Sequence, residues 1–220
     1  MCQGSLRGQC ESMVSMARPR NQTARRDQLV AAAGRVLLDR GSSAARLSDI
    51  ANEAGVTPAA VLYYYRDVDE LFSEVFHQGV TEYCDRREAR IQAESDPEAQ
   101  LRACIHSGVP WPGESETASR ILVELIPVYL RNKAAARQQM AFVERQTNLY
   151  KGILERGAQE DAFTLSAPAG FLARSFVALE DGLVMDVLLG DLTPEDEYEF
   201  LISYATNMVK AKTGNNLQLS

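Results

Sequence analysis

Three consecutive tyrosines and an arginine, Tyr63 to Arg66, are the side chains in this sequence whose types and spacing point most directly to chemistry. Successive residues of an α-helix turn by about 100°, so three tyrosines in a row cover more than half of the circumference. They cannot all face one hydrophobic core. A tyrosine hydroxyl can donate a hydrogen bond to a phosphate oxygen, and arginine pairs with phosphate charge. The group therefore indicates a surface that meets a polyanion.

Two short helices are expected to position this group. Apolar residues recur at helical spacing over residues 47–54, and Gly55 follows where a helix favours glycine at its end. Thr57 is the expected N-cap and Pro58 the first residue of a second helix, 58–65. Two short helices joined by a tight turn form a helix-turn-helix, whose second helix enters the major groove of DNA.

The spacing within the second helix assigns the tyrosines to different sides. Val61 and Tyr65 are four residues apart and are predicted to face the small core. Tyr63 and Tyr64 then point toward the groove and the phosphates. The alternative is that they pack on the next helix or on a neighbouring subunit.

The predicted DNA contacts fall into two groups. Polar side chains are expected to meet phosphates, and short apolar ones suit the methyl group of thymine at the base edges. The full set is Arg46, Ser48, Thr57, Pro58, Ala59, Ala60, Leu62, Tyr63, Tyr64 and Arg66.

The distribution of charge agrees with a polyanion at the N-terminal end. The net charge is −7, yet residues 1–66 carry nine arginines, no lysine and only five acidic residues. Hydrophobic content of 45% is typical of a folded protein, and no apolar run is long enough to cross a membrane. The N-terminus has no apolar secretory signal, and the four scattered cysteines suit a reduced compartment, so we expect a cytoplasmic protein.

At these residues the sequence closely resembles the TetR family of transcriptional regulators. The resemblance covers about residues 25–72 and rests on a helix with paired alanines, the helix-turn-helix and the acidic start of a fourth helix. The matching residues are Leu29, Ala32, Ala33, Leu37, Gly41, Ile50, Ala51, Ala54, Gly55, Val56, Thr57, Tyr63, Tyr64, Tyr65, Glu70 and Leu71. The resemblance implies a three-helix DNA-binding head, a ligand-binding helical body, and a homodimer built from the last two helices.

Five positions depart from the family pattern. Arg46 stands where Thr or Ser usually caps the first helix of the motif, so Ser43 or water is expected to satisfy that helix end. Val68 stands where a phosphate-binding lysine is common. Ala59 and Ala60 replace a common Gly-Thr pair, and Leu62 a common tyrosine, so the operator sequence does not follow from them.

The rest of the chain reads as all-α, with about nine helices in total and no run of clean strand alternation. Expected helices cover residues 68–93, 96–108, 115–131, 133–160, 167–189 and 193–212. The predicted organisation is a disordered basic arm over 1–24, a helix-turn-helix domain over 25–72, and a ligand-binding and dimerisation domain over 73–220.

A ligand site in the body would need a cavity lined by apolar side chains. The candidates are Tyr83, Ile105, Trp111, Glu124, Leu125, Tyr129, Phe142 and Phe176. Glu124 interrupts an apolar segment, and it pairs with Arg120, lies at the surface or orients a cationic ligand. The predicted effector is a small, mostly apolar molecule.

The dimer interface is predicted on the two most apolar helices, near the C-terminus. Two antiparallel helices that pair with their copies form a four-helix interface with twofold symmetry. The candidates are Leu179, Gly182, Leu183, Leu189, Tyr198, Leu201, Ile202 and Ala205.

Catalysis finds little support in the sequence. His77 and His106 have no metal-binding spacing, and no nucleophile motif or phosphate loop is evident, so we expect no enzyme activity, cofactor or metal. The interpretation is a DNA-binding regulator, a repressor that an apolar ligand releases from a palindromic operator. The alternatives are a helix-turn-helix protein regulated without a small ligand and a small all-α enzyme.

Overall fold

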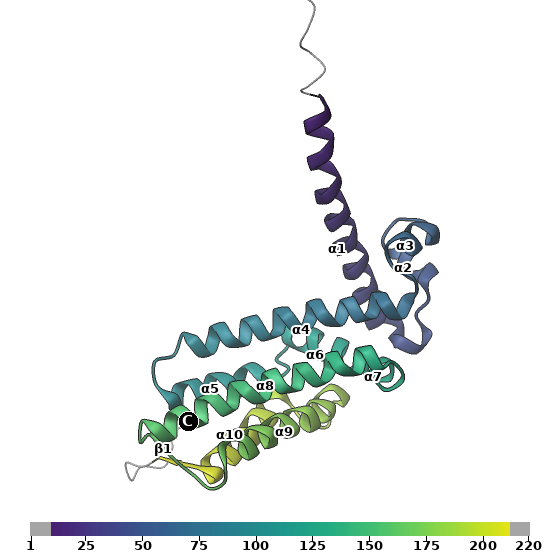
Figure 1. Ribbon diagram of the computed structural model, residues 1–220. Helices are drawn as coiled ribbons and strands as arrows, with labels where there is room; N and C mark the ends of the chain where they lie inside the picture. Colours follow the sequence, from purple (N-terminus) through teal and green to yellow (C-terminus); the bar gives the residue numbers. More distant parts are fainter. Residues whose placement is uncertain (1–9, 212–220) are drawn as a thin grey trace, which may run out of the picture. The chain divides into compact units, whose positions relative to one another are not determined.

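The computed structural model describes residues 10–211. Within them lie ten helical segments and one short two-stranded ladder. The chain divides into two compact units, Met1–Val75 and Phe76–Ser220. Figure 1 labels the helices of both units. None of the described helices is long and apolar enough to cross a membrane.

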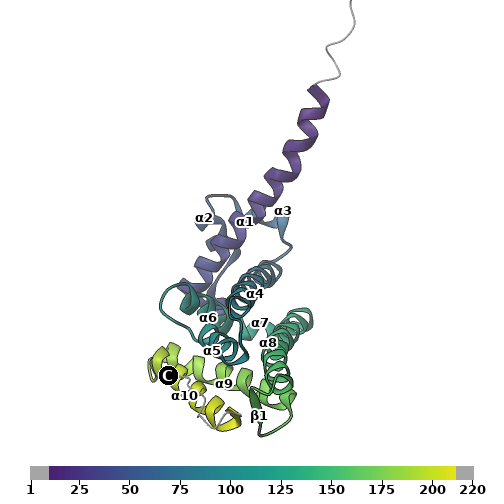
Figure 2. The same ribbon diagram turned by 90° about the vertical axis from the view of Figure 1, so that its left-hand side faces the viewer.

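Unit 1 is built from α1 (Cys10–Ala44), α2 (Leu47–Glu53), α3 (Pro58–Tyr64) and the start of α4 (Val68–Gln92). Figure 2 shows α1, α2 and α3 grouped together. Apolar faces of these helices meet in a small core in which Leu29, Leu37, Ile50 and Val61 are fully buried. Burial of these faces stabilises helices that are too short to persist alone.

The helical run of α1 is interrupted at Gly41, as the sequence predicts. Its φ of 70° and ψ of 162° leave the helical region, and such a positive φ is open to glycine at little cost. The α4 start is also as predicted, because the Asp67 carboxylate accepts a hydrogen bond of 2.8 Å from the Glu70 backbone N–H.

The N-terminal arm differs from the expectation. Helix α1 begins at Cys10, so residues 10–24 are helical where disorder was expected. A helix that is already nucleated by packing can extend without apolar periodicity, although Pro19 within this segment removes one helical hydrogen bond. Residues 1–9 of the expected arm lie outside the described residues.

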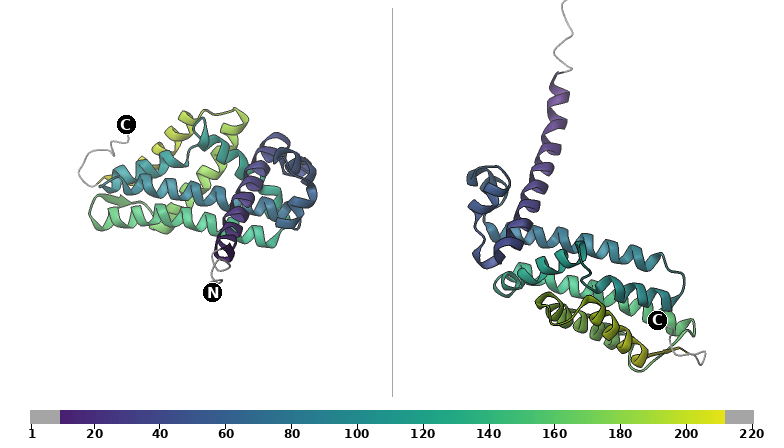
Figure 3. Two further views of the ribbon diagram at one scale, coloured as in Figure 1. Left: turned by 90° about the horizontal axis from the view of Figure 1, so that it is seen from above. Right: turned by 180° about the vertical axis from the view of Figure 1, so that it is seen from behind.

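Unit 2 contains the remainder of α4 and six further helices: α5 (Pro97–Gly108), α6 (Glu114–Glu124), α7 (Ile126–Arg131), α8 (Lys133–Gln159), α9 (Ala169–Leu189) and α10 (Pro194–Met208). Figure 3 shows α9 and α10 side by side, and both pack in the same core as α5 and α8. That core includes Leu101, Ile105, Tyr150, Phe176 and Leu201.

Two boundaries in unit 2 depart from the sequence prediction. The helix expected over 115–131 breaks at Leu125, because Pro127 has no N–H to continue the hydrogen-bond ladder. The last helix stops at Met208, and Val209–Ala211 (β2) pairs antiparallel with Phe163–Leu165 (β1). Each strand has only three residues, which is too short to show the alternation that predicts a strand. The two strands are also distant in the sequence, so their pairing could not be predicted.

Candidate functional site

The helix-turn-helix has the geometry that its capping residues predict. The Thr57 hydroxyl accepts a hydrogen bond of 3.2 Å from the Ala60 N–H, and Pro58 occupies the first turn of α3. Val61 is fully buried, and Tyr65 is only 3% exposed. On the opposite side, Tyr63 is 73% exposed and Leu62 is 52% exposed. Helix α3 therefore presents an outward face of one large phenol and several short side chains.

Tyr64 takes an intermediate position. It is half-buried, and its ring meets that of Tyr63 edge to face at 5.0 Å between centroids. Its backbone carbonyl accepts a hydrogen bond of 3.5 Å from Arg26, whose guanidinium lies 5.3 Å from the Tyr65 ring centroid. Tyr63 is therefore the more accessible of the two predicted phosphate contacts.

Arg46 has a structural role that the sequence did not predict. Its guanidinium donates to the carbonyl oxygens of Ser43 and Ala45 at 3.0 and 3.2 Å, at the end of α1. The start of α2 is satisfied by the Asp49 carboxylate, which accepts a hydrogen bond of 2.9 Å from the Arg46 backbone N–H. Within the described residues no hydrogen bond joins Ser43 to the start of α2, so the expectation of a Ser43 cap was wrong; its carbonyl oxygen accepts from Arg46 instead.

The remaining predicted DNA contacts lie on accessible surface. Ser48, Pro58, Ala59 and Arg66 are exposed, and Ala60 is half-buried. Arg66 pairs with Glu70, its Nε lying 3.2 Å from the carboxylate. The hydrogen bond from the Arg66 backbone N–H holds the pKa of Glu70 below its usual value.

Unit 2 contains a cavity of about 240 Å³. Its walls come from six helices, α4 to α9, and they include Tyr83, Tyr129 and Phe142 of the predicted ligand-binding residues. The Tyr83 and Phe142 rings meet edge to face at 5.8 Å. Apolar side chains of α6 and α9, among them Leu122 and Val184, complete the lining.

The other predicted ligand-binding residues do not line this cavity. Ile105, Leu125 and Phe176 are fully buried by core packing. Glu124 is exposed at the last position of α6, so the surface interpretation holds for it, and Arg120 pairs instead with Glu116 at 2.9 Å. An amphipathic helix has an exposed polar face, and Glu124 lies on that face although its neighbours in the sequence are apolar.

Trp111 lies at a separate hollow of about 280 Å³ lined by residues of α4 and of the α5–α6 connection. Its indole stacks on His106 at 4.9 Å and donates a hydrogen bond of 2.9 Å to the His106 carbonyl. Trp111 therefore does not line the first cavity, and its indole packs on His106 of α5.

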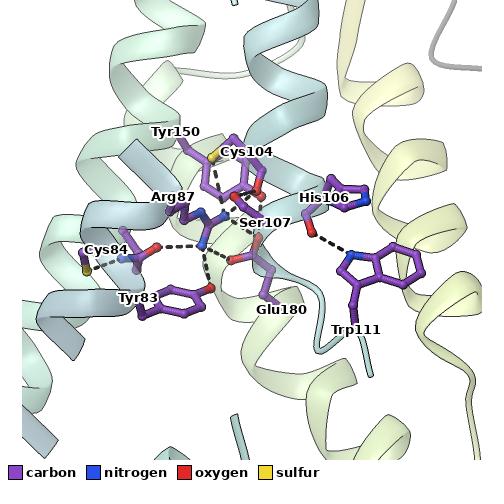
Figure 4. A network of polar contacts seen from close by, with 10 residues as sticks. Tyr83, Cys84, Arg87, Cys104, His106, Ser107, Trp111, Tyr150 and Glu180 are labelled. Carbon is purple, nitrogen blue, oxygen red and sulfur yellow. Dashed lines mark hydrogen bonds and ion pairs between the residues drawn. The ribbon is translucent and has the colours of Figure 1, made fainter. Parts of the chain in front are cut away.

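The cavity wall also carries a buried ion pair that sequence reasoning missed. The side chain of Arg87 on α4 is only 1% exposed, and its Nη2 lies 2.6 Å from Glu180 Oε1 on α9. Arg87 further donates to Gln146 on α8 at 2.6 Å, to the Tyr83 hydroxyl at 3.1 Å and to the Cys104 carbonyl at 2.9 Å (Figure 4). Four helices are therefore held by one guanidinium.

Glu180 is satisfied from two sides. The Tyr150 hydroxyl donates to its Oε1 at 2.5 Å, in addition to the two contacts from Arg87 (Figure 4). Gly108 makes this approach possible, because a Cβ there would lie 2.1 Å from Glu180 Oε1. A signal was available in the sequence, since Glu180 and Asp181 interrupt an apolar helix just as Glu124 does.

Burial dominates the environment of the two buried cysteines, although Cys104 Sγ accepts a hydrogen bond of 3.4 Å from Arg87. Cys84 and Cys104 are free and buried, and burial raises the pKa of the Cys104 thiol to about 11. A neutral buried thiol is a poor nucleophile. Within the part of the chain that the structure describes, no group of acidic, histidine or cysteine side chains could hold a metal ion.

The predicted dimer residues are split between two environments. Leu201 and Ala205 are fully buried in the core of unit 2, so they were wrongly placed in an interface between copies. Leu179, Leu183, Tyr198 and Ile202 are half-buried against the same core. Gly182 and Leu189 are exposed, and Phe171 and Phe200, which the sequence analysis left out, are exposed apolar residues on the same two helices.

A helix-turn-helix with an exposed recognition face, in one chain with a helical unit that contains a cavity, defines a DNA-binding regulator. The family model for bacterial regulatory proteins of the tetR family matches residues 29–75. The head therefore carries the DNA-binding segment of the TetR family, and the chain is a DNA-binding transcriptional regulator. The resemblance drawn from the sequence is thereby confirmed.

One sequence relative and two solved structures illustrate this similarity. The chain is 27% identical over 160 residues to the HTH-type transcriptional regulator BetI of Stenotrophomonas maltophilia, covering 72% of this chain and 79% of that protein. A transcriptional regulator from Saccharomonospora viridis in complex with choline has a TM-score of 0.80 at 21% identity, over 86% of this chain and 99% of its own. FadR from Bacillus subtilis in complex with stearoyl-CoA has a TM-score of 0.68 at 18% identity, over 80% and 97%.

Proposed function

We propose that this protein is a homodimeric repressor that a small ligand releases from a palindromic operator. The observation that carries the proposal is the cavity in unit 2, which is lined from six helices and lies in a unit separate from the helix-turn-helix. A body used only for dimerisation has no need of such a cavity. The similar regulators in complex with choline and with stearoyl-CoA support a ligand-responsive role.

On the DNA side, α3 enters the major groove. Thr57 and Tyr63 contact phosphates, and Ala59 and Leu62 lie at base edges, because these residues form the outward face of α3. Ser48, Pro58, Ala60, Tyr64 and Arg66 complete the surface. Arg46 is exposed, and its contacts with the end of α1 use only Nη1, so its other guanidinium N–H groups are directed to a phosphate.

The dimer forms through α9 and α10. Phe171, Leu189 and Phe200 expose large apolar side chains on these helices, and Gly182 allows close approach of a helix from the second copy. An exposed apolar surface of this kind is typical of an association site. A twofold dimer then presents two recognition helices, which requires an operator with two symmetric half-sites.

Ligand and DNA are coupled through α4, whose residues belong to both units. Tyr83 and Arg87 on this helix line the cavity. A ligand that binds better to the form with wrongly spaced heads shifts the population away from the DNA-binding form. The coupling therefore requires that the ligand has different affinities for the DNA-binding form and for the form with wrongly spaced heads.

The test is a footprint on the DNA that flanks the gene of this protein, followed by anisotropy measurements on the protected duplex. We expect a palindromic protected region, steep loss of affinity with salt and a mass of twice 24.3 kDa by light scattering. A compound that binds the cavity should then release the duplex. A bound compound that never changes DNA affinity would leave a helix-turn-helix protein regulated without a small ligand.

A further inference from the structure

The cavity wall carries one positive and two negative side chains, and only one of the two negative charges is paired. Arg87, Glu180 and Asp181 are the charged residues that line it. The single positive charge, Arg87, is paired with Glu180 through contacts of 2.6 and 3.1 Å. Its remaining contacts go to neutral acceptors on α4, α5 and α8. Arg87 is therefore not available to attract an anionic ligand.

Asp181 carries the charge that remains. Among the residues that the structure describes, its carboxylate has no hydrogen bond or ion pair. Partial burial and the charge of Glu180 raise the pKa of this carboxyl, and the charges of Arg174 and Arg87 act in the opposite direction. It is also exposed to solvent, in contrast to its buried neighbour Glu180. An accessible carboxylate beside a neutralised ion pair makes the cavity attractive to cations and unattractive to carboxylates, phosphates and other anions.

The aromatic lining points to the same chemistry. Tyr83, Tyr129 and Phe142 contribute three rings to one cavity. The Tyr83 hydroxyl accepts from Arg87, and the Tyr129 hydroxyl donates to the Leu122 carbonyl at 3.4 Å. The Tyr129 hydroxyl is thus engaged as a donor and the Tyr83 hydroxyl as an acceptor. The Arg87 guanidinium lies 5.9 Å from the Tyr83 ring centroid, so a ligand would meet the ring surface that Arg87 leaves uncovered. Aromatic faces attract alkylammonium groups through cation–π interaction, and they need no hydrogen-bond donor on the ligand.

We infer that the cavity binds a small organic cation with a quaternary ammonium group, held by the Asp181 carboxylate and the rings of Tyr83, Tyr129 and Phe142. The inference deepens the proposed function, on which it rests. The volume of about 240 Å³ lies near the small end of ligand cavities and suits a compact headgroup better than a long acyl chain. Of the two ligands seen in similar regulators, choline has this chemistry and stearoyl-CoA, an anion, does not.

The first experiment measures binding by calorimetry to the full-length protein. The probes are choline and its neutral carbon isostere, in which a tert-butyl group replaces the trimethylammonium group. The two have the same shape, so a difference reports the charge. We expect choline to bind at least roughly tenfold more tightly, since cation–π and carboxylate attraction act together. Equal affinities, or binding of the isostere alone, would overturn the inference.

The second experiment places the charge at Asp181. The variant Asp181→Asn should weaken choline binding by roughly five- to tenfold and leave the affinity for the neutral isostere unchanged. The matched control is Asp186→Asn, which removes the same charge from the same helix at a residue that does not line the cavity. The control should bind both probes as the parent protein does. Equal losses in the two variants would show only a general field effect and would contradict the assigned site.

DNA release separates this inference from the function on which it rests. If choline binds in the expected way but leaves operator affinity unchanged, ligand regulation fails and the cation site stands. If choline does not bind, while a neutral apolar compound binds the cavity and releases the operator, the cation site fails and the proposed function stands. Melting temperatures of both variants, measured without ligand, exclude unfolding as the cause of lost binding.

Discussion

The DNA-binding head and the helical body build their sites in opposite ways. In the head, the outward face of α3 is made by residues within one short stretch, and the structure there depends on local caps such as Thr57 and Asp49. In the body, the cavity wall depends on Arg87 and Glu180, which are 93 residues apart in the chain. The head keeps its functional groups at the surface, and the body buries charged groups behind its cavity.

The two regions differ in how strongly a change in a functional residue affects folding. An exposed side chain on α3 can change with little effect on folding, because nothing else depends on its position. Arg87 holds α4, α5, α8 and α9, so a change there leaves a buried carboxylate without its partner. A buried ion pair adds little net stability, yet removal of one partner is costly. Function in the body is therefore tied to folding far more closely than in the head.

The largest expected effect comes from Arg87→Met. It should lower the free energy of unfolding by about 3–5 kcal/mol, because Glu180 then lacks its counter-charge in a buried site. Urea unfolding at neutral pH measures it. The control is Arg145→Met, which removes contacts with Asp85 and Glu88 at the surface and should cost less than about 1 kcal/mol. Similar losses in the two variants would contradict the buried network.

A matched pair of Tyr→Phe changes compares the two regions directly. Tyr150→Phe should cost about 1.5–3 kcal/mol, because its hydroxyl donates to the Glu180 carboxylate. Tyr65→Phe in the head should be neutral or slightly stabilising, because the Tyr65 hydroxyl is buried without a partner. Urea unfolding of both variants tests the pair. A loss for Tyr65→Phe as large as that for Tyr150→Phe would remove the contrast.

The pH dependence of stability should report Glu197 on α10. Glu197 is fully buried, and neither of its carboxylate oxygens has a hydrogen-bond partner. Burial, and after it the charge of Glu180, raises the pKa of this carboxyl from 4.5 to about 8. The folded state therefore favours the protonated form, whereas the unfolded chain is ionised above its own pKa. The contribution of Glu197 to the free energy of unfolding is therefore fully present below pH 4.5 and is lost as the pH rises toward 8.

The variant Glu197→Gln tests this behaviour. It should be about 1–2 kcal/mol more stable than the parent at pH 7.5 and should lose this part of the pH dependence, since its amide does not ionise. Urea unfolding at pH 5 and pH 7.5 gives both quantities. Glu199→Gln on the exposed side of the same helix is the control, and it should not change the slope with pH. An unchanged slope in Glu197→Gln would assign the pH dependence to other groups.

The smallest expected effect lies on the surface of the head. Tyr63→Phe should weaken binding to all duplexes by about 1 kcal/mol, the value of one hydrogen bond to a phosphate, with no change in stability. Anisotropy with operator and random duplexes measures both affinities. Tyr198→Phe, in the body, is the matched control and should bind DNA as the parent does. A change in base preference would show that Tyr63 reads a base edge rather than a phosphate.

The sequence by itself determined the head. Gly41, Thr57 and Pro58 set the ends of helices through backbone geometry and capping, which act between near neighbours in the chain. The spacing of Val61 and Tyr65 then settled which tyrosine is buried, and the family followed from the same short segment. The all-helical class of the body was equally predictable, because helical periodicity is a local property.

Only the tertiary structure shows which charged residues of the body are exposed and which form the buried ion pair. The sequence offered Glu124 and Glu180 as equal interruptions of apolar helices, yet Glu124 is exposed and Glu180 meets Arg87. It also could not show that Leu201 and Ala205 face the core while Phe171 and Phe200 face outward. These outcomes depend on how helices from distant parts of the chain rotate against one another. The free energy that sets this rotation comes from contacts between helices, which the periodicity of one helix does not contain.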